Sequence, residues 1–158
     1  LSGERTPHND PHIRGSFHAI KTTTDATNMQ YAVIEGVSFG ILDGVNSILK
    51  VNDNFEKIFM VGGGSRSSFW IELLASLLNR NLSVCDQSEY GAALGVARLA
   101  MHSDKSIQNN NIIKEITTSK DYFPSSNKSD ILMKRYQIWK DLYSTNKKIA
   151  SNLISKSS

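Results

Sequence analysis

The chain has 158 residues, of which 39% are hydrophobic and 21% are charged. This balance excludes a disordered polypeptide and predicts one globular α/β domain with a hydrophobic core. The formal net charge of +3 is too small to indicate a nucleic-acid-binding protein, and the single cysteine, Cys85, excludes an internal disulfide and a cysteine-based zinc cluster.

No stretch contains the roughly 18 uninterrupted apolar residues that are typical of a membrane span, and the first residues lack a signal-peptide pattern. We therefore expect no membrane contact, and the single cysteine is typical of a protein of the reducing cytoplasm. The opening residues, LSGERTPHNDP, are typical of the middle of a protein, so we also expect this chain to be a fragment.

The first fourteen residues are predicted to form a shaped loop, because Pro7 and Pro11 interrupt a polar stretch. His8 and His12 are four residues apart, a spacing that could bind a metal on a helix. Since the prolines exclude that helix, we predict no metal site here. Residues 15–20 are predicted to form a short strand.

Residues 28–50 are predicted to form a helix, because apolar residues recur along one face: Met29, Val33, Val37, Ile41, Val45 and Ile48. Small residues form a second row at intervals of four: Ala32, Gly36, Gly40 and Gly44. Because a glycine inside a helix costs about 1 kcal/mol relative to alanine, this row predicts close packing against a sheet or another helix. A close ligand approach is the alternative.

An apolar run at 57–61 predicts a buried strand, and Gly62, Gly63 and Gly64 follow it directly. A helix is predicted from Trp70 onwards, where apolar residues recur at the spacing of one face: Leu73, Leu74, Leu77 and Leu78. The junction of strand, glycine turn and helix N-terminus is suited to a phosphate or to the polar edge of a nucleotide. Alternatively, the glycines only let the helix turn back onto the sheet.

The second half of the chain repeats this alternation. Residues 82–85 predict a second strand, and 89–101 predict a helix rich in small residues that is suited to close packing on a sheet. Alternating elements of this kind predict parallel strands with helices on the faces. Residues 103–129 are predicted to form a polar, partly disordered connection, and 130–154 an amphipathic terminal helix docked on the domain.

These residues leave three classes of function open. The first is a dinucleotide-binding half-fold, in which Gly62 and Gly64 begin a G-x-G-x-x-G pattern and Asp86 would meet a ribose, although Ser67 replaces the last glycine. The second is the nucleotide-binding half of an actin-like sugar kinase. The third is an interaction domain without enzymatic activity.

Four motifs in order carry a more specific resemblance: SGERTPHNDP, VIEGVSFGILDG, VGGGSRSSFW and GAALGVARLA. Together they closely resemble the C-terminal domain of the FGGY carbohydrate kinases, and among them the xylulose kinases. The second family signature maps onto Gly15, Phe17, Ile20, Asn28, Met29, Ala32, Val33, Ile34 and Glu35. Ala19 departs from this signature, because it stands where the family usually has glycine.

The resemblance implies the ribonuclease H-like, actin-like ATPase fold. The chain would be the C-terminal lobe of a two-domain sugar kinase, incomplete at its N-terminal side, with 1–158 forming one nucleotide-binding domain. An incomplete sheet has an unpaired edge, which is expected to favour a homodimer or marginal stability.

The resemblance also implies the site residues. Gly63, Gly64, Ser65 and Ser68 are the candidate contacts to the adenosine part of ATP, with simple N-capping as the alternative role of either serine. The loop residues His8, Asn9 and Asp10 are expected to line or shape the cleft. The aspartate that serves the family as catalytic base lies upstream of the matched stretch, so no catalytic residue is expected in this chain.

The implied reaction is phosphoryl transfer from ATP, with Mg²⁺, to D-xylulose, giving D-xylulose 5-phosphate. This substrate follows mainly from the loop that includes Thr6 and Pro7, and ribulose, gluconate and glycerol are the alternatives. The expected partners are ATP, D-xylulose and the missing N-terminal part of the protein. By itself the chain is expected to be inactive.

Overall fold

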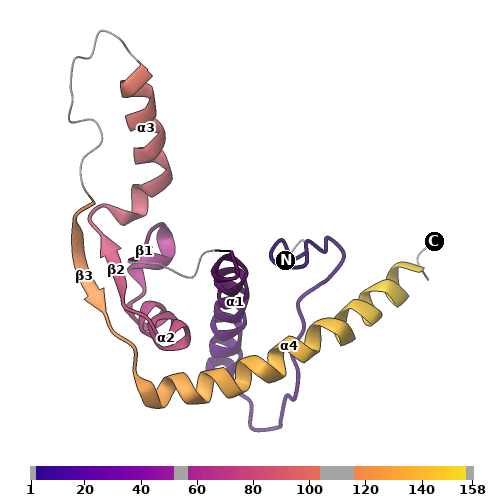
Figure 1. Cartoon of the computed structure of the whole chain (residues 1–158). Coiled ribbons are helices and arrows are strands. Elements are labelled where there is room, and N and C mark those ends of the chain that lie inside the picture. The colour runs from indigo at the N-terminus through magenta and orange to yellow at the C-terminus, as the bar shows by residue number, and fades with distance from the viewer. Residues whose placement is uncertain (1–2, 52–56, 104–115, 156–158) are drawn as a thin grey trace. The chain divides into compact units, whose positions relative to one another are not determined.

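A computed structural model describes residues 3–51, 57–103 and 116–155 (Figure 1). These residues form two compact units, each with its own contacts. The first unit combines Leu1–Phe55 with Ser126–Ser158, and the second consists of Glu56–Ser125. The sequence also predicts a polar turn at 51–56, of which only Val51 is described, and the asparagine run 109–111 of the predicted connection lies outside the described residues.

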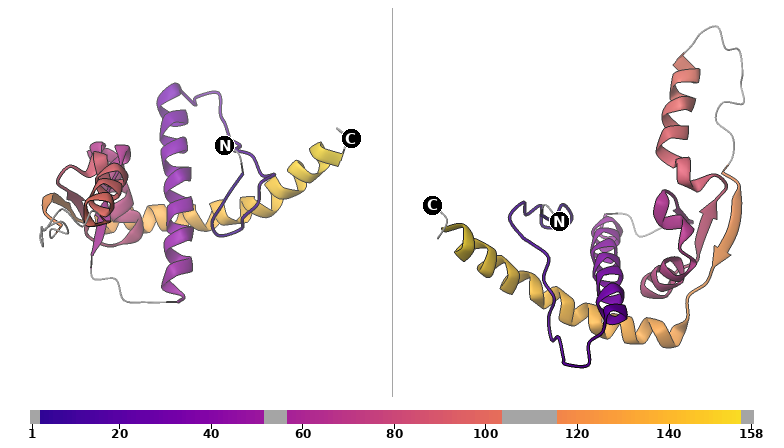
Figure 2. Two further views of the ribbon diagram at one scale, coloured as in Figure 1. Left: turned by 90° about the horizontal axis from the view of Figure 1, so that it is seen from above. Right: turned by 180° about the vertical axis from the view of Figure 1, so that it is seen from behind.

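The first unit is built from two long helices and the N-terminal loop. Helix α1 spans Ala26–Leu49 and helix α4 spans Ser126–Ser155. Asp25 caps α1 by accepting a hydrogen bond from the Asn28 backbone N–H at 2.8 Å. The left view of Figure 2 shows α1 crossing α4, and both views show the N-terminal loop beside the second half of α4.

Aromatic side chains join the two helices. Phe39 of α1 lies with its ring centroid 5.7 Å from that of Tyr136 and 5.8 Å from that of Trp139, both on α4. Tyr136 also donates a short hydrogen bond to Asp43 and accepts one from Asn46 at 3.2 Å. Burial and the neighbouring Asp43 raise the pKa of Tyr136 to about 12, so its hydroxyl stays protonated.

The predicted apolar face of α1 is not the face that packs. The buried residues of α1 are Glu35, Ser38, Phe39 and Leu42, whereas Val33, Val37, Ile41 and Ile48 are all at least 38% exposed. The small-residue row is also less crowded than predicted: a Cβ on Gly36 or Gly44 would meet its nearest neighbour at 3.9 Å, and one on Gly40 would meet nothing. The face of α1 that carries these four valine and isoleucine residues is therefore not covered by any other described part of the chain.

Helix α1 is long and apolar enough, by length and composition alone, to cross a membrane. The sequence lacks an uninterrupted apolar run of this length because Glu35 and Asp43 interrupt the apolar residues of α1. Both carboxylates are held by residues of α4, Arg135 and Tyr136. The core helix of a soluble protein passes the same test, so this property of α1 is weak evidence for a membrane segment.

The second unit contains a three-stranded sheet in the order β1-β2-β3, formed by Ile58–Met60, Leu82–Cys85 and Thr118–Tyr122. Strands β1 and β2 are parallel, as predicted, with Ile58 opposite Leu82. Helix α2, Ser68–Leu78, contributes Ile71, Leu74 and Ala75 to a core that also contains Leu82, Val84 and Tyr122. The predicted order of strand, glycine turn, helix and strand is confirmed.

Several predicted elements are wrong or shifted. Residues 15–20 form no strand, and helix α3 spans Gly91–Ser103 without a single buried residue, so the predicted close packing on the sheet is absent from the described residues. The predicted connection 103–129 contains strand β3, which pairs antiparallel with β2. The predicted terminal helix at 130–154 begins earlier, at Ser126. Strand β3 was not predicted, because four of its five residues are exposed and the segment therefore lacks the apolar residues that mark a strand in the sequence.

Candidate functional site

The glycine turn of the second unit connects β1 to α2 through a short 3₁₀ helix, Gly63–Arg66. Gly62 precedes it with φ +82°, a conformation that side-chain-bearing residues rarely adopt. The Gly62 N–H donates to the Ser88 carbonyl oxygen at 2.6 Å, which ties the turn to the segment after β2. Ser67 then caps α2 by accepting a hydrogen bond from the Trp70 N–H at 3.3 Å.

The three glycines serve different purposes. A Cβ built on Gly62 or Gly63 would have no neighbour within 4 Å, so the backbone at these two positions is open to an approaching ligand. A Cβ on Gly64 would lie 2.9 Å from Cζ3 of Trp70. Packing against the Trp70 ring therefore explains Gly64, while open backbone is what Gly62 and Gly63 provide.

The hydroxyl groups of the two predicted contact serines are engaged within the fold. Buried Ser65 donates to the Gly62 carbonyl at 2.7 Å, and its oxygen lies 2.6 Å from that of Ser88. The Ser68 hydroxyl lies 2.9 Å from the hydroxyl of Tyr122 on β3. Neither serine caps α2, so the predicted alternative of N-capping is wrong for both, and Ser67 fills that role. Their contact with a nucleotide stays a prediction.

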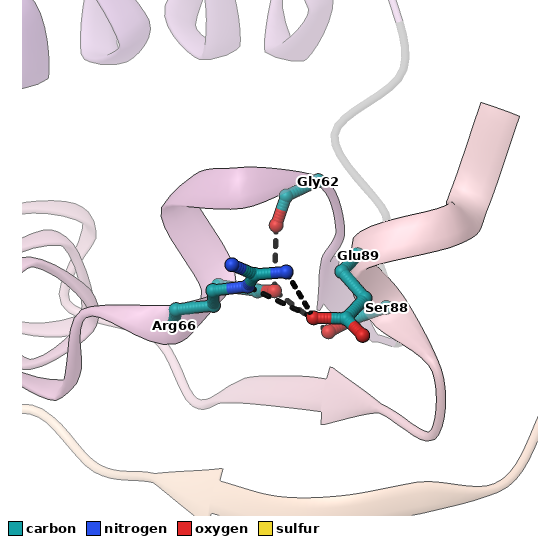
Figure 3. Close-up of polar contacts among 5 residues, drawn as sticks. Gly62, Arg66, Ser88 and Glu89 are labelled. Carbon is teal, nitrogen blue, oxygen red and sulfur yellow. Dashed lines mark hydrogen bonds and ion pairs between the residues drawn. The ribbon is translucent and has the colours of Figure 1, made fainter.

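An ion pair lies at the end of the turn (Figure 3). Arg66 donates from Nε and Nη2 to one carboxylate oxygen of Glu89, at 2.8 and 2.5 Å. This hydrogen bonding lowers the pKa of Glu89 and keeps the carboxylate ionised. Because Glu89 balances the charge of Arg66, the turn has little net charge, which suits a flat polar base better than a phosphate group.

The cleft loop lies in the first unit. The Glu4 N–H donates to the Asp10 carbonyl at 2.8 Å, and the Asn9 N–H donates to the Arg5 carbonyl at 3.1 Å, so the loop closes on itself. Gly3, with φ +102°, permits this closure, because a Cβ there would lie 2.6 Å from the Asp10 carbonyl oxygen. His8 and Asp10 both contact Tyr143 of α4.

The two predicted groups of site residues fall into different units. Residues 8–10 belong to the first unit and residues 63–68 to the second. Sequence reasoning missed Ser88, Glu89 and Tyr143, because each meets its partner across more than twenty intervening residues. The sequence places three candidate cap residues at the start of the helix, Ser65, Ser67 and Ser68, and Ser67 is the one that caps α2.

Residues suited to holding a metal ion do not gather within the parts that the structure describes. No group of three or more His, Cys, Asp or Glu side chains converges there.

Comparison with known proteins places this geometry in a family. The model of the C-terminal domain of the FGGY family of carbohydrate kinases matches residues 1–103. The xylulose kinase of Escherichia coli (strain K12) is 29% identical over 146 residues, which cover 90% of this chain and 30% of that protein. The chain thus spans about three tenths of the length of this curated relative.

Solved structures agree with the sequence matches. A xyloylose kinase from Brucella ovis superposes with a TM-score of 0.80 and 32% identity, over 94% of this chain and 31% of that one. A gluconate kinase from Lactobacillus acidophilus superposes with a TM-score of 0.72 and 26% identity, over 92% of this chain and 30% of that one. The predicted actin-like ATPase fold is confirmed, and the dinucleotide-binding half-fold is not supported. The chain belongs to the FGGY family of carbohydrate kinases, because its residues 1–103 match the C-terminal domain of that family.

Proposed function

We propose that the chain supplies the ATP-binding lobe of a xylulose kinase. The observation that carries this proposal is the glycine turn at the start of α2, where the Gly62 and Gly63 backbone is open to a ligand in a chain of the FGGY family. The reaction would transfer the γ-phosphoryl group of ATP to a hydroxyl of D-xylulose, giving D-xylulose 5-phosphate and ADP. The hydroxyl proton would pass to a base outside this chain.

The residues of the turn would act by positioning the nucleotide. The open backbone at Gly62 and Gly63 accommodates the flat adenine or the ribose at van der Waals distance. Ser65, Ser88 and the Arg66–Glu89 ion pair hold the turn in shape and keep its surroundings nearly neutral. When Mg²⁺ is bound, it would neutralise charge on the transferring phosphates.

The names of the relatives support D-xylulose as the acceptor. The Escherichia coli relative quoted above is named a xylulose kinase and the Brucella ovis protein a xyloylose kinase. The family match begins at residue 1, so it includes the loop residues His8, Asn9 and Asp10. Gluconate is the second candidate, because the Lactobacillus acidophilus gluconate kinase has the same fold at 26% identity. Ribulose and glycerol are further alternatives within this family.

The exposed apolar face of α1 supports a partner for this chain. Val33, Val37, Ile41 and Ile48 form a strip that the described residues leave uncovered, and the curated relative is longer than this chain. We expect the remainder of the kinase polypeptide to cover this strip, and a homodimer to form when that remainder is absent.

A cytoplasmic location is the setting that we propose for such an enzyme.

Calorimetric titration of the chain with ADP and, separately, with NAD tests the nucleotide site. Gly63→Val should abolish ADP binding without changing the melting temperature, because its side chain enters open space. Gly95→Val is the matched control, since Gly95 of α3 is equally open. Binding of NAD, or ADP binding that Gly63→Val leaves unchanged, would contradict the proposed site.

The acceptor is tested with the complete kinase polypeptide that carries this chain. ADP release should be measured with D-xylulose, ribulose, gluconate and glycerol at equal concentration. We expect the largest kcat/KM for D-xylulose. A larger value for gluconate would replace the proposed substrate, and activity with none of the four would overturn the proposed kinase function.

A further inference from the structure

Tyr143 of α4 contacts the cleft loop with both parts of its side chain. Its hydroxyl donates to Oδ2 of Asp10 at 3.1 Å, across 133 positions of sequence. Its ring stacks on the imidazole of His8, with the centroids 3.6 Å apart and the planes 10° from parallel. One side chain thereby holds the loop at two points on either side of Asn9.

Asp10 is the residue on which the loop contacts converge. Its carboxylate accepts the His12 backbone N–H through Oδ1 at 2.9 Å, and Lys147 Nζ lies 4.0 Å from Oδ2. The side chain is only 11% exposed, whereas that of Lys147 is 59% exposed. The His12 N–H and the Tyr143 hydroxyl lower the pKa of Asp10, so the carboxylate is ionised at neutral pH and these bonds are charge-assisted.

The loop is also braced from its own side. The Glu4 carboxylate accepts the His8 N–H at 3.1 Å, and the Glu4 N–H donates to the Asp10 carbonyl at 2.8 Å. Asn9 stands between the two anchored residues, exposed and with φ +48°. Its backbone conformation is uncommon for a residue with a side chain, so the anchors on both sides determine where Asn9 projects.

We propose that Tyr143 and Lys147 of α4 are positioning residues for the acceptor sugar, because they hold loop residues 8–10 in the conformation that shapes the cleft. Neither residue is proposed to touch the reacting atoms, and Tyr143 carries most of the effect through its stack on His8 and its bond to Asp10. The inference rests on the proposed kinase function and on the expectation that loop residues 8–10 line or shape the cleft. It extends that function to α4, a helix whose two positioning residues lie beyond the 103 residues that the family model matches.

Steady-state kinetics of the complete kinase polypeptide provide the first test. Tyr143→Leu, which removes both contacts, should raise KM for the sugar roughly tenfold and leave KM for ATP within about twofold. Tyr143→Phe retains the stack and should raise KM for the sugar only about threefold. Lys147→Gln should have a smaller effect in the same direction, and Lys148→Gln, on the exposed neighbour, should have none.

Amide hydrogen exchange in the chain itself provides the second test. Tyr143→Leu should speed exchange at Glu4, Asn9 and His12 by about tenfold or more, while amides at the contact between Phe39 and Trp139 stay protected. Unchanged loop exchange, or an equal rise in KM for ATP and sugar, would overturn the positioning role. A complete kinase without activity on any sugar would refute the proposed function, and the exchange experiment would still decide whether α4 holds the loop.

Discussion

Glu35 in α1 and Arg135 in α4 form an ion pair in which only one partner is exposed. Oε2 of Glu35 lies 2.9 Å from Nη2 of Arg135, and the two side chains are 8% and 50% exposed. Burial raises the pKa of Glu35 and Arg135 opposes this shift. The arginine therefore offsets part of the effect of burial on this carboxylate, at the junction of the two helices.

Removing Arg135 should destabilise the first unit in a pH-dependent manner. Arg135→Met leaves a buried charge without its partner, so we expect the free energy of unfolding to fall by about 2 kcal/mol at pH 7. A carboxyl whose pKa is higher in the folded than in the unfolded protein binds its proton more tightly when folded, and lowering the pH through the folded pKa therefore adds stability. The deficit of Arg135→Met should accordingly shrink between pH 7 and pH 5, as measured by urea unfolding.

The double variant Glu35→Gln/Arg135→Met is the control for this prediction. Because the glutamine is neutral, the double variant should recover most of the stability at pH 7 and lose the pH dependence. A deficit of equal size at pH 7 and pH 5 would show that the charge of Glu35 is not its cause.

Gly64 should be intolerant of even the smallest side chain, unlike its neighbour Gly63. A methyl group on Gly64 would lie 2.9 Å from the Trp70 ring, so we expect Gly64→Ala to lower the free energy of unfolding by about 1–3 kcal/mol. Gly63→Ala should change it by less than about 0.5 kcal/mol. Adding Trp70→Leu should partly restore Gly64→Ala, and an unrestored double variant would place the strain elsewhere.

Strand β3 can be tested with two adjacent aromatic residues. Tyr122 is buried in the sheet core and its hydroxyl lies 2.9 Å from that of Ser68, whereas the neighbouring Phe123 is 66% exposed. Tyr122→Ala should cost about 3–5 kcal/mol in urea unfolding, and Phe123→Ala less than about 1 kcal/mol. Equal effects would argue against the antiparallel pairing of β2 and β3, which places Tyr122 opposite Leu82.

A charge placed on the exposed strip of α1 should affect stability differently in the chain alone and in a complete kinase. Val37→Lys should leave the stability of the chain within about 0.5 kcal/mol and reduce its self-association, because Val37 is about half exposed. In the complete polypeptide the same change should destabilise by about 2 kcal/mol or more, because it would bury a charge. Sedimentation velocity measures the first effect and thermal unfolding the second. Equal stability of both complete forms would contradict the proposed cover over α1.

The sequence alone was sufficient to identify the family and the glycine turn, because both depend on short stretches. The strand at 58–60, the turn at 62–64, helix α2 and strand β2 follow one another within 28 positions, and each has a local pattern of apolar residues or glycines. The N-cap before α2 is local in the same sense. The order of these elements and the parallel pairing of β1 with β2 could therefore be predicted.

Only the tertiary structure decided which faces pack and which side chains hold the site. Periodicity predicted an apolar face on α1 but could not show that Phe39 and Glu35, rather than Val33 and Val37, would meet α4. Strand β3 has no alternation of apolar and polar residues that would mark it in the sequence. It is defined by its hydrogen bonds to β2, which form only in the folded chain. The contact of Tyr143 with Asp10 joins residues 133 positions apart, and no local pattern encodes a contact that exists only after the chain has folded.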